Sequence, residues 1–344
     1  MSSRESREAL ITEGPREKAI VVENLLKTYP PDIRAVDTIG FSVDSGEVFG
    51  LLGPNGAGKT TTIKMITGLI KPTSGSLRLF GVDVAKSPQA ARRLMGYVPQ
   101  NVSVDGDLSG YENLLIFSRL FFVERDERRE RIAKALEYVG LSGRADELVK
   151  HYSGGMMRRL EVAQALVNRP KILFLDEPAI GLDPGSRREI WESIRQLRKD
   201  FGTTIFITTH DMSEADYLCD RVAIMDSGKI VVMGSPSELK ESLGGDIVTF
   251  QLTRPGRELM LPVELGQVVH QDDSTVKVLT HDGRRTAPLM VLALKDQGIE
   301  MESMSIDIPS LDDVFLKYTK KRLDEHGNIT EARAVRRSIA RYSR

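Results

Sequence analysis

The chain has 344 residues, a formal net charge of −1, 40% hydrophobic residues and 28% charged residues. These values are ordinary for a globular protein of one large domain with a smaller attachment, or of two domains. The near-zero net charge gives no global field that would favour nucleic acid or a membrane surface. The single cysteine, Cys219, excludes an intrachain disulfide, fits a reducing compartment and is expected to be a small core residue. No apolar run approaches the length of a membrane span.

The first part of the chain alternates short apolar runs with turns. Residues 1–18 are charged and polar and lack the apolar core of a secretory signal, so we expect a loosely ordered tail. Residues 19–22 are predicted to form a strand, and residues 27–31 a turn. Tyr29 could stack on a nucleotide base or be a half-buried aromatic of a hairpin, and the residues alone leave both interpretations open.

The strongest motif of the chain follows an apolar strand predicted at residues 48–52. A glycine-rich loop and a helix come next, and together they match the phosphate-binding pattern G-x-x-x-x-G-K-[ST] at every fixed position. Glycines permit positive φ and let backbone N–H groups surround a phosphate, and the helix dipole favours an anion there. We predict that Lys59 reaches the β- and γ-phosphates of a nucleotide and that the Thr60 hydroxyl holds Mg²⁺. The predicted nucleotide contacts are Gly53, Pro54, Asn55, Gly56, Ala57, Gly58, Lys59, Thr60 and Thr61.

Strand signals end after residues 96–100, a predicted strand with the polar Gln100 at its end. Helical periodicity then dominates, and the helix at residues 124–139 is predicted to end at Gly140. We therefore expect a helical subdomain at about residues 101–168, inserted into an α/β core. Apolar residues of its first helix are predicted to share one face: Leu114, Leu115, Phe117, Leu120 and Phe121.

Polar residues recur where later helices begin and strands end. Ser153 is a suitable N-cap, and with Gly154 and Gly155 behind it this helix start is either an anion site or a plain loop and cap. The apolar run 172–177 ends in two carboxylates, at the edge where open α/β sheets place their ligands. Asp176 suits Mg²⁺, directly or through water, and Glu177 suits a base that polarises water. The strand at residues 204–209 ends on His210, at the same ligand edge.

The stretch Leu243-Gly244-Gly245 is the best candidate domain boundary. Beyond it we expect a small α+β unit with strands at 247–252, 267–270, 276–279 and 300–306, a turn at 282–283, and helices at 288–296 and 311–318. His270 and His281 lack partners at metal-ligand spacing, so no zinc site is expected. The domains are therefore 19–244 and 245–319, flanked by the tail 1–18 and a basic tail 320–344, which is expected to be flexible and solvated.

Together these residues resemble the motif order of the ATP-binding cassette (ABC) ATPases over residues 19 to about 243. Residues 53–61 resemble the Walker A loop, Ser153 to Met156 the signature motif, and residues 172–177 the Walker B strand with its catalytic Glu. Tyr29 stands at the place of the adenine-stacking aromatic, Gln100 at the Q-loop, Asp183 at the D-loop, and His210 at the switch histidine. Residues 96–100, 181–184 and 309–316 further resemble the daunorubicin/doxorubicin-resistance type.

The resemblance implies an α/β P-loop NTPase fold and an ATPase that uses ATP and Mg²⁺, with Gln100 linking Mg²⁺ to the membrane partner. It implies two copies packed head to tail, so that Ser153, Gly154, Gly155 and Asp183 of one copy complete the site of the other. It also implies export through a separate ABC-2 type permease, a location at the inner face of the cell membrane, and no nucleic-acid partner.

Two departures from the family pattern concern the composite site. Tyr152 replaces the usual Leu of the signature, and the D-loop reads Ile180-Gly181-Leu182-Asp183. One alternative is a non-transport ABC ATPase acting on nucleic acid or ribosomes, although tandem cassettes and long coiled coils are absent from the sequence. The other is an inactive regulatory cassette, against which the retained Lys59, Glu177 and His210 argue.

Overall fold

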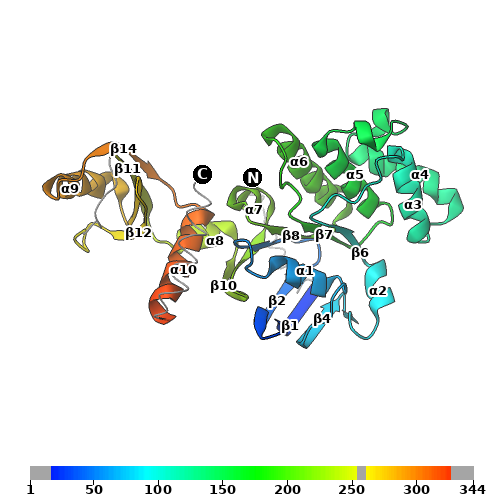
Figure 1. The fold of residues 1–344 in the computed structure, drawn as a ribbon, viewed down its shortest axis with the longest axis horizontal. Coiled ribbons are helices and arrows are strands. Elements are labelled where there is room, and N and C mark those ends of the chain that lie inside the picture. Colours follow the sequence, from blue (N-terminus) through cyan, green and yellow to red (C-terminus); the bar gives the residue numbers. More distant parts are fainter. Residues whose placement is uncertain (1–16, 254–260, 327–344) are drawn as a thin grey trace, which may run out of the picture.

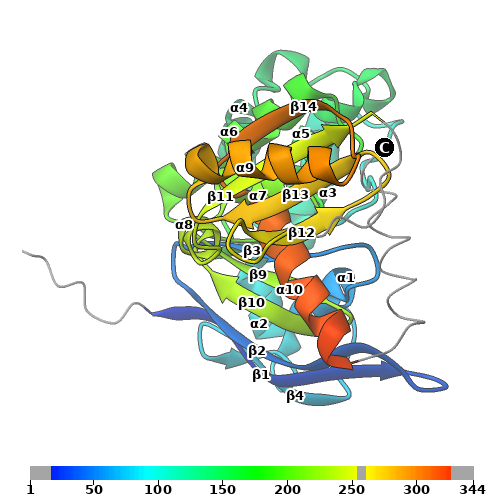
Figure 2. The same ribbon diagram turned by 90° about the vertical axis from the view of Figure 1, so that its left-hand side faces the viewer.

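The structure is a computed structural model that describes residues 17–253 and 261–326. Residues 1–16 of the tail expected at 1–18 and residues 327–344 of the basic tail expected at 320–344 lie outside the described residues, whereas Lys18 already begins the first strand. Figures 1 and 2 show a large mixed α/β part, with a helical lobe at one end and a smaller sheet-and-helix unit at the other. No helix among the described residues is long and apolar enough to cross a membrane.

A six-stranded sheet forms the centre of the large part, in the order β10-β9-β3-β8-β7-β6. Its inner strands are buried along their whole length because parallel strands covered on both faces require continuous apolar runs. The rings of Phe49 and Phe206 stack 5.7 Å apart between neighbouring strands. The strands are β3 (Val48–Leu52), β6 (Met95–Val98), β7 (Ile172–Asp176), β8 (Thr204–Thr209), β9 (Arg221–Asp226) and β10 (Lys229–Gly234).

A second, antiparallel sheet lies beside it, in the order β2-β1-β4-β5. The sequence predicted a short first strand and a turn at residues 27–31, but β1 runs without interruption to Tyr29. The prediction was wrong because several register shifts between β1 and β2 absorb the irregular apolar pattern, including one between Val22 and Leu25. The strands are β1 (Lys18–Tyr29), β2 (Ile33–Asp44), β4 (Ser74–Leu79) and β5 (Val82–Asp83).

The helical lobe contains α3 (Gly110–Leu120), α4 (Arg125–Tyr138) and α5 (Gly154–Leu166), with short 3-10 turns at Ser142–Arg144 and Val149–His151. A capping box between Ser109 and Glu112 starts α3, as this pair of residue types favours. The expectation of one shared apolar face on α3 was wrong at its end. Leu114 is fully buried, but Leu120 is 63% exposed and Phe122, just beyond the helix, is 83% exposed.

The remaining helices of the large part connect or cover the central strands (Figure 1). The helix α6 buries Ile190, Ile194 and Leu197, and Asp183 caps its first turn. Cys219, which follows α7, is buried as expected. These helices are α1 (Lys59–Ile66), α2 (Pro88–Arg93), α6 (Pro184–Phe201), α7 (Met212–Leu218) and α8 (Pro236–Glu241).

The C-terminal unit is an antiparallel sheet in the order β12-β13-β11-β14, with α9 (Gly283–Asp296) packed on it. The expected turn at residues 282–283 was wrong. Asp282 instead caps α9 by accepting a hydrogen bond from the Arg285 N–H, so the helix begins five residues before Pro288. The strands are β11 (Asp246–Leu252), β12 (Gln267–Gln271), β13 (Thr275–Thr280) and β14 (Met301–Asp307).

The last helix, α10 (Leu311–His326), returns from this unit to the large part (Figure 2). It extends past residue 320, where the sequence predicted a tail. Leu311 and Val314 are buried, and they belong to the same hydrophobic core as Met212 and Leu218 of α7. The C-terminal residues therefore supply part of the core of the large domain.

Candidate functional site

The phosphate-binding loop lies between the end of β3 and the start of α1. Gly53 and Gly58 have φ angles of +152° and +107°, and a Cβ on either would clash with a backbone carbonyl. At Gly53 it would lie 2.1 Å from the Met225 oxygen, and at Gly58 it would lie 2.4 Å from the Ala35 oxygen. Only glycine fits at these two positions, because both the φ angle and the close backbone approach exclude a side chain. The loop is thus held against β9 and β2 with its backbone close to that of its neighbours.

The side chain of Lys59 is the cation of this loop. Only 4% of this side chain is exposed to solvent. Its Nζ donates hydrogen bonds to the carbonyl oxygens of Gly53 at 2.8 Å and Pro54 at 3.2 Å. The same atom lies 3.3 Å from Glu177 Oε1. Burial lowers the pKa of Lys59, and the neighbouring charge of Glu177 opposes this shift. Lys59 thus connects the loop to the end of β7.

Lys59, Glu177 and His210 form a cluster of titratable side chains, called the charged cluster below. Glu177, directly after β7, lies at its centre. Its Oε2 lies 2.8 Å from Nδ1 of His210, which follows β8. Glu177 has a φ of +51°, a left-handed conformation that is costly for a residue with a side chain. Its N–H donates to the Thr208 carbonyl at 2.9 Å, which ties the strained residue to β8. The carboxyl ends of β3, β7 and β8 therefore bring Lys59, Glu177 and His210 into contact.

Burial and neighbouring charges act against each other on these groups. Burial acts to raise the pKa of Glu177, but the hydrogen bond with His210 and the charge of Lys59 outweigh it, and the pKa is lowered. The hydrogen bond with Glu177 raises the pKa of His210 above 6.5. Burial raises the pKa of Asp176, although the Thr208 hydroxyl donates a hydrogen bond to its carboxylate. Glu177 is thus a carboxylate at neutral pH, next to a histidine that gains a proton readily.

The residues at this edge fit a nucleotide with a divalent cation. The buried amine of Lys59 suits phosphate oxygens, and Gly58 has no side chain with which to cap α1, so backbone N–H groups remain at the helix start. Asp176 and the half-buried Thr60 offer a carboxylate and a hydroxyl oxygen, which are ligand types that Mg²⁺ prefers.

The other predicted site residues lie elsewhere on the surface. Tyr29 is 38% exposed at the end of β1, Gln100 is exposed after β6, and Ser153 is the exposed N-cap of α5. Asp183 caps α6 by accepting from the Ser186 N–H at 3.0 Å. The contacts of Glu177 with Lys59 and with His210 involve none of these four residues.

The start of α5 packs on the start of α6. A Cβ on the buried Gly155 would lie 2.5 Å from the Ser186 hydroxyl oxygen, so a small residue is required there. Gly154 is exposed, as is Ser153, whose hydroxyl accepts from the Met156 N–H. The polar start of α5 is therefore exposed at the surface.

Sequence reasoning missed three residues that surround the site. Thr208 bonds both Asp176 and the N–H of Glu177, and the half-buried Tyr97 lies near enough to Asp176 to be affected by its charge. Burial, followed by the charge of Asp176, raises the pKa of Tyr97 to about 12, so this phenol stays neutral. Arg158 of α5 is the third. Thr208 could have been found from the sequence, because it is a polar residue next to the end of a buried strand. The residues around Arg158 give no such indication of its role.

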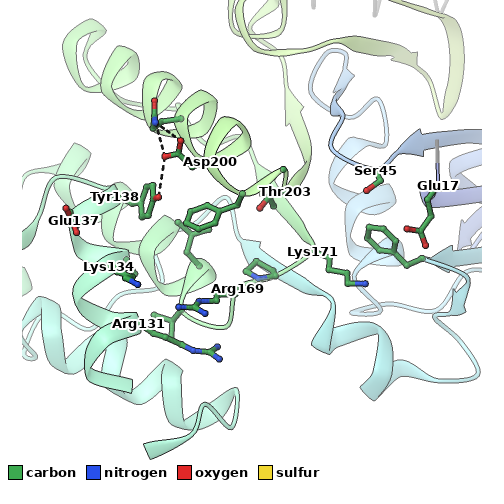
Figure 3. A pocket seen from close by; sticks show the side chains of 18 residues that line it. Glu17, Ser45, Arg131, Lys134, Glu137, Tyr138, Arg169, Lys171, Asp200 and Thr203 are labelled. Carbon is green, nitrogen blue, oxygen red and sulfur yellow. Dashed lines mark hydrogen bonds between the residues drawn. The ribbon is translucent and has the colours of Figure 1, made fainter. Parts of the chain in front are cut away.

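A separate pocket of about 870 Å³ lies at the amino ends of β7 and β8, where Lys171 and Thr203 precede the two strands (Figure 3). Arg131 and Lys134 line it, but both are paired with glutamates of their own helix, α4. None of the predicted nucleotide contacts lines this pocket. The pocket is therefore distinct from the phosphate-binding loop.

Comparison with known proteins identifies the class. Residues 36–180 match the family model described as ABC transporter. The chain also resembles solved ABC cassettes, with a TM-score of 0.62 and 31% identity to CbiO1 from Clostridium perfringens, over 66% of this chain and 94% of that one. The dimeric bacterial cassette MJ0796 gives a TM-score of 0.57 at 27% identity, over 63% of this chain and 98% of that one. The chain belongs to the ABC transporter ATPases, as its motifs predicted, and it binds and hydrolyses ATP as a transporter subunit.

The C-terminal unit identifies a narrower group within the ABC ATPases. Residues 234–319 match the model described as the C-terminal domain of DrrA1-3-like ATP-binding proteins. The daunorubicin/doxorubicin resistance ATP-binding protein DrrA of Streptomyces peucetius is 40% identical over 94% of this chain and 98% of its own length. The linearmycin resistance ATP-binding protein LnrL of Bacillus subtilis is 37% identical, over 88% and 98% respectively. The Nod factor export ATP-binding protein I of Cupriavidus metallidurans is 39% identical, over 88% and 97%. The chain is thus an ABC ATPase with a DrrA-like C-terminal domain.

Proposed function

We propose that this chain uses ATP hydrolysis to drive export through a separate ABC-2 type membrane permease. The names of its relatives, which refer to drug resistance and to export of a Nod factor, support this direction of transport. Docking on the permease would hold the chain at the inner face of the cell membrane. Residues 19–244 would act as the ATP-binding domain, with its helical part at about 101–168, and residues 245–319 as the accessory domain.

The contact of Glu177 with both Lys59 and His210 carries the mechanistic part of the proposal. Lys59 binds the β- and γ-phosphates together with backbone N–H groups of the loop, and Tyr29 stacks on the base. Glu177 accepts a proton from the attacking water, and His210 holds both Glu177 and the γ-phosphate. Thr60, Asp176 and Gln100 would hold Mg²⁺, which neutralises charge on the phosphates when bound.

A second copy of the cassette would complete the site. Ser153 and Gly154 are exposed at the amino end of α5, and Asp183 is exposed at the start of α6. A helix start of this kind binds anions through its N–H groups. In a head-to-tail pair, Ser153, Gly154 and Gly155 of one copy would contact the γ-phosphate held by the other, with Asp183 close by.

The end of α3 is suited to contact with the permease. Ile116 and Leu120 lie one helical turn apart and are 44% and 63% exposed, and Phe122 follows with 83% exposed. Exposed apolar side chains that gather in this way mark interaction sites. They lie on the helical lobe, which begins just after Gln100.

Co-expression with a candidate ABC-2 type permease tests the assignment. We expect the chain to sediment with membranes only when that permease is present, and Phe122→Asp to release it without lowering the ATPase activity of the purified chain. A chain that stays in the supernatant with the permease present would contradict the transport role. Wild-type protein without any ATP hydrolysis would instead contradict the proposed site.

A further inference from the structure

Arg158 lies on α5, five residues beyond the exposed Ser153, and points into the protein. Its side chain is only 5% exposed, and that of Glu161, one turn further along, is 1% exposed. The two form an ion pair at 2.9 Å. Burial of a guanidinium costs free energy unless its hydrogen-bond donors have acceptors. The acceptors of Arg158 therefore indicate why an arginine is buried here.

Every N–H of Arg158 has an acceptor. A guanidinium has five N–H donors in a planar fork. Nε donates to the Pro178 carbonyl at 2.9 Å, and one terminal nitrogen donates to Glu161 at 2.9 Å and to the Pro99 carbonyl. The other terminal nitrogen donates to the carbonyls of Asp176 at 3.0 Å and Glu177 at 3.1 Å. Three separate segments therefore meet on one side chain: α5, the residue before Gln100, and the end of β7.

These bonds act on the strained residue of the site. Glu177 has a φ of +51°, and its N–H is held by Thr208 of β8. Its carbonyl is held by Arg158, so the two peptide groups on either side of its Cα are each held by a hydrogen bond. Strained conformations persist only where the surroundings determine them fully. The conformation of Glu177 in turn directs its carboxylate towards Lys59 and His210.

Glu161 extends the same network to the loop after β6. Its Oε1 accepts hydrogen bonds from the backbone N–H of Ser103 at 2.5 Å and from the Ser103 hydroxyl at 2.9 Å, while its Oε2 accepts from Arg158. The segment that contains Gln100 is thus held at Pro99 and at Ser103 by two side chains of α5.

We propose that Arg158 is a positioning residue for ATP hydrolysis, which holds Glu177 in its left-handed conformation and connects that conformation to α5 and the Gln100 loop. This inference rests on the proposed role of Glu177 as the base. The five donors of Arg158 all bond acceptors of the protein itself, so we infer that it acts through Glu177. Its loss is therefore expected to slow the chemical step while ATP affinity is retained.

The variant Arg158→Lys keeps the charge but has three donors in place of five, so at least two acceptors lose their bonds. We expect kcat to fall by about tenfold to a hundredfold, because small misplacements of a catalytic group have effects of that size. The KM for ATP should change by less than about threefold. Arg159→Lys is the matched control, since Arg159 is adjacent on the same helix, donates to the Val139 carbonyl and is expected to keep the wild-type kcat.

Combination with Glu177→Gln separates positioning from general damage to the fold. If Arg158 acts only through Glu177, Arg158→Lys should lower the residual kcat of Glu177→Gln by less than twofold. Additive losses, or an Arg158→Lys kcat within twofold of wild type, would overturn the proposal. A Glu177→Gln protein with wild-type turnover would instead refute the role of Glu177 itself.

Should Arg158→Lys fail to fold, the pair Arg158→Met with Glu161→Leu removes both buried charges together, which is milder than leaving one unpaired. The same outcome is expected from it: a low kcat at unchanged ATP affinity. A kcat that stays at the wild-type level in this folded double variant would refute the inference.

Discussion

Replacement of Glu177 by Gln is the most informative change at the site, because it keeps the size of the side chain and removes its charge. With an effective dielectric constant of about 20, two unit charges at the Lys59–Glu177 distance of 3.3 Å attract each other by about 5 kcal/mol. Burial acts on Glu177 in the opposite direction. The attraction outweighs the desolvation cost, since the pKa of Glu177 is lowered, and the change leaves the buried Lys59 without this charge partner, so we expect a lower Tm.

The effect on catalysis is expected to be much larger. General-base help is worth about a hundredfold to ten-thousandfold, or about 3–5 kcal/mol of the barrier. ATP binding should be retained or tightened, since a negative charge next to the phosphates has been removed. The variant should then accumulate as a dimer with ATP and Mg²⁺, whereas Asp176→Asn should impair Mg²⁺-dependent binding and dimer formation together.

Phosphate release and light scattering coupled to size-exclusion chromatography, with and without ATP and Mg²⁺, measure both effects. Wild-type protein should dimerise only transiently under the same conditions. A Glu177→Gln chain that binds ATP yet stays monomeric, or that turns over within tenfold of wild type, would refute the reasoning.

Further predictions concern the neighbouring groups. Lys59→Ala should abolish ATP hydrolysis with the fold intact, by circular dichroism and phosphate release; hydrolysis at the wild-type rate would disprove the phosphate-loop assignment. Ser153→Arg should leave ATP affinity of the single chain nearly unchanged and abolish turnover, whereas equal losses of both would point to a role in its own site. The raised pKa of His210 stabilises the fold fully below pH 6.5, and this contribution is lost as pH rises through the folded-state pKa. The pKa of Glu177 is lowered in the fold, so its carboxylate stabilises the fold fully above pH 4.5. This contribution is lost as pH falls through the folded-state pKa of Glu177. The Tm deficit of His210→Ala should therefore be largest between pH 4.5 and 6.5 and smaller at pH 8.5, and a deficit independent of pH would contradict the ion pair.

The central sheet and the charged cluster could be predicted from sequence because one physical rule covers both. Strands buried on two faces are continuous apolar runs, and the polar residue after each run lies at the same edge of a parallel sheet. Lys59, Glu177 and His210 each follow such a run. Their contact therefore follows from the pattern.

Features that depend on distant partners could not be predicted in this way. Arg158 is one of many arginines, and its acceptors at Pro99 and Asp176 come from distant parts of the sequence. Likewise, nothing in the apolar spacing of α3 shows that Leu120 lacks a covering neighbour. The full length of β1 depends on register shifts, which a search for regular alternation does not detect.

The return of α10 to the large domain has a consequence for how the chain is made. Leu311 and Val314 complete a core that also contains Met212, Leu218 and Leu239. During synthesis these three apolar residues leave the ribosome long before their last partners do, with the whole C-terminal sheet still to come. The ATP-binding domain is therefore expected to mature late, after nearly the entire chain has emerged, and to depend on protection of this surface until then. A chain that ends at residue 244 contains every motif residue, but it would be released with that surface uncovered.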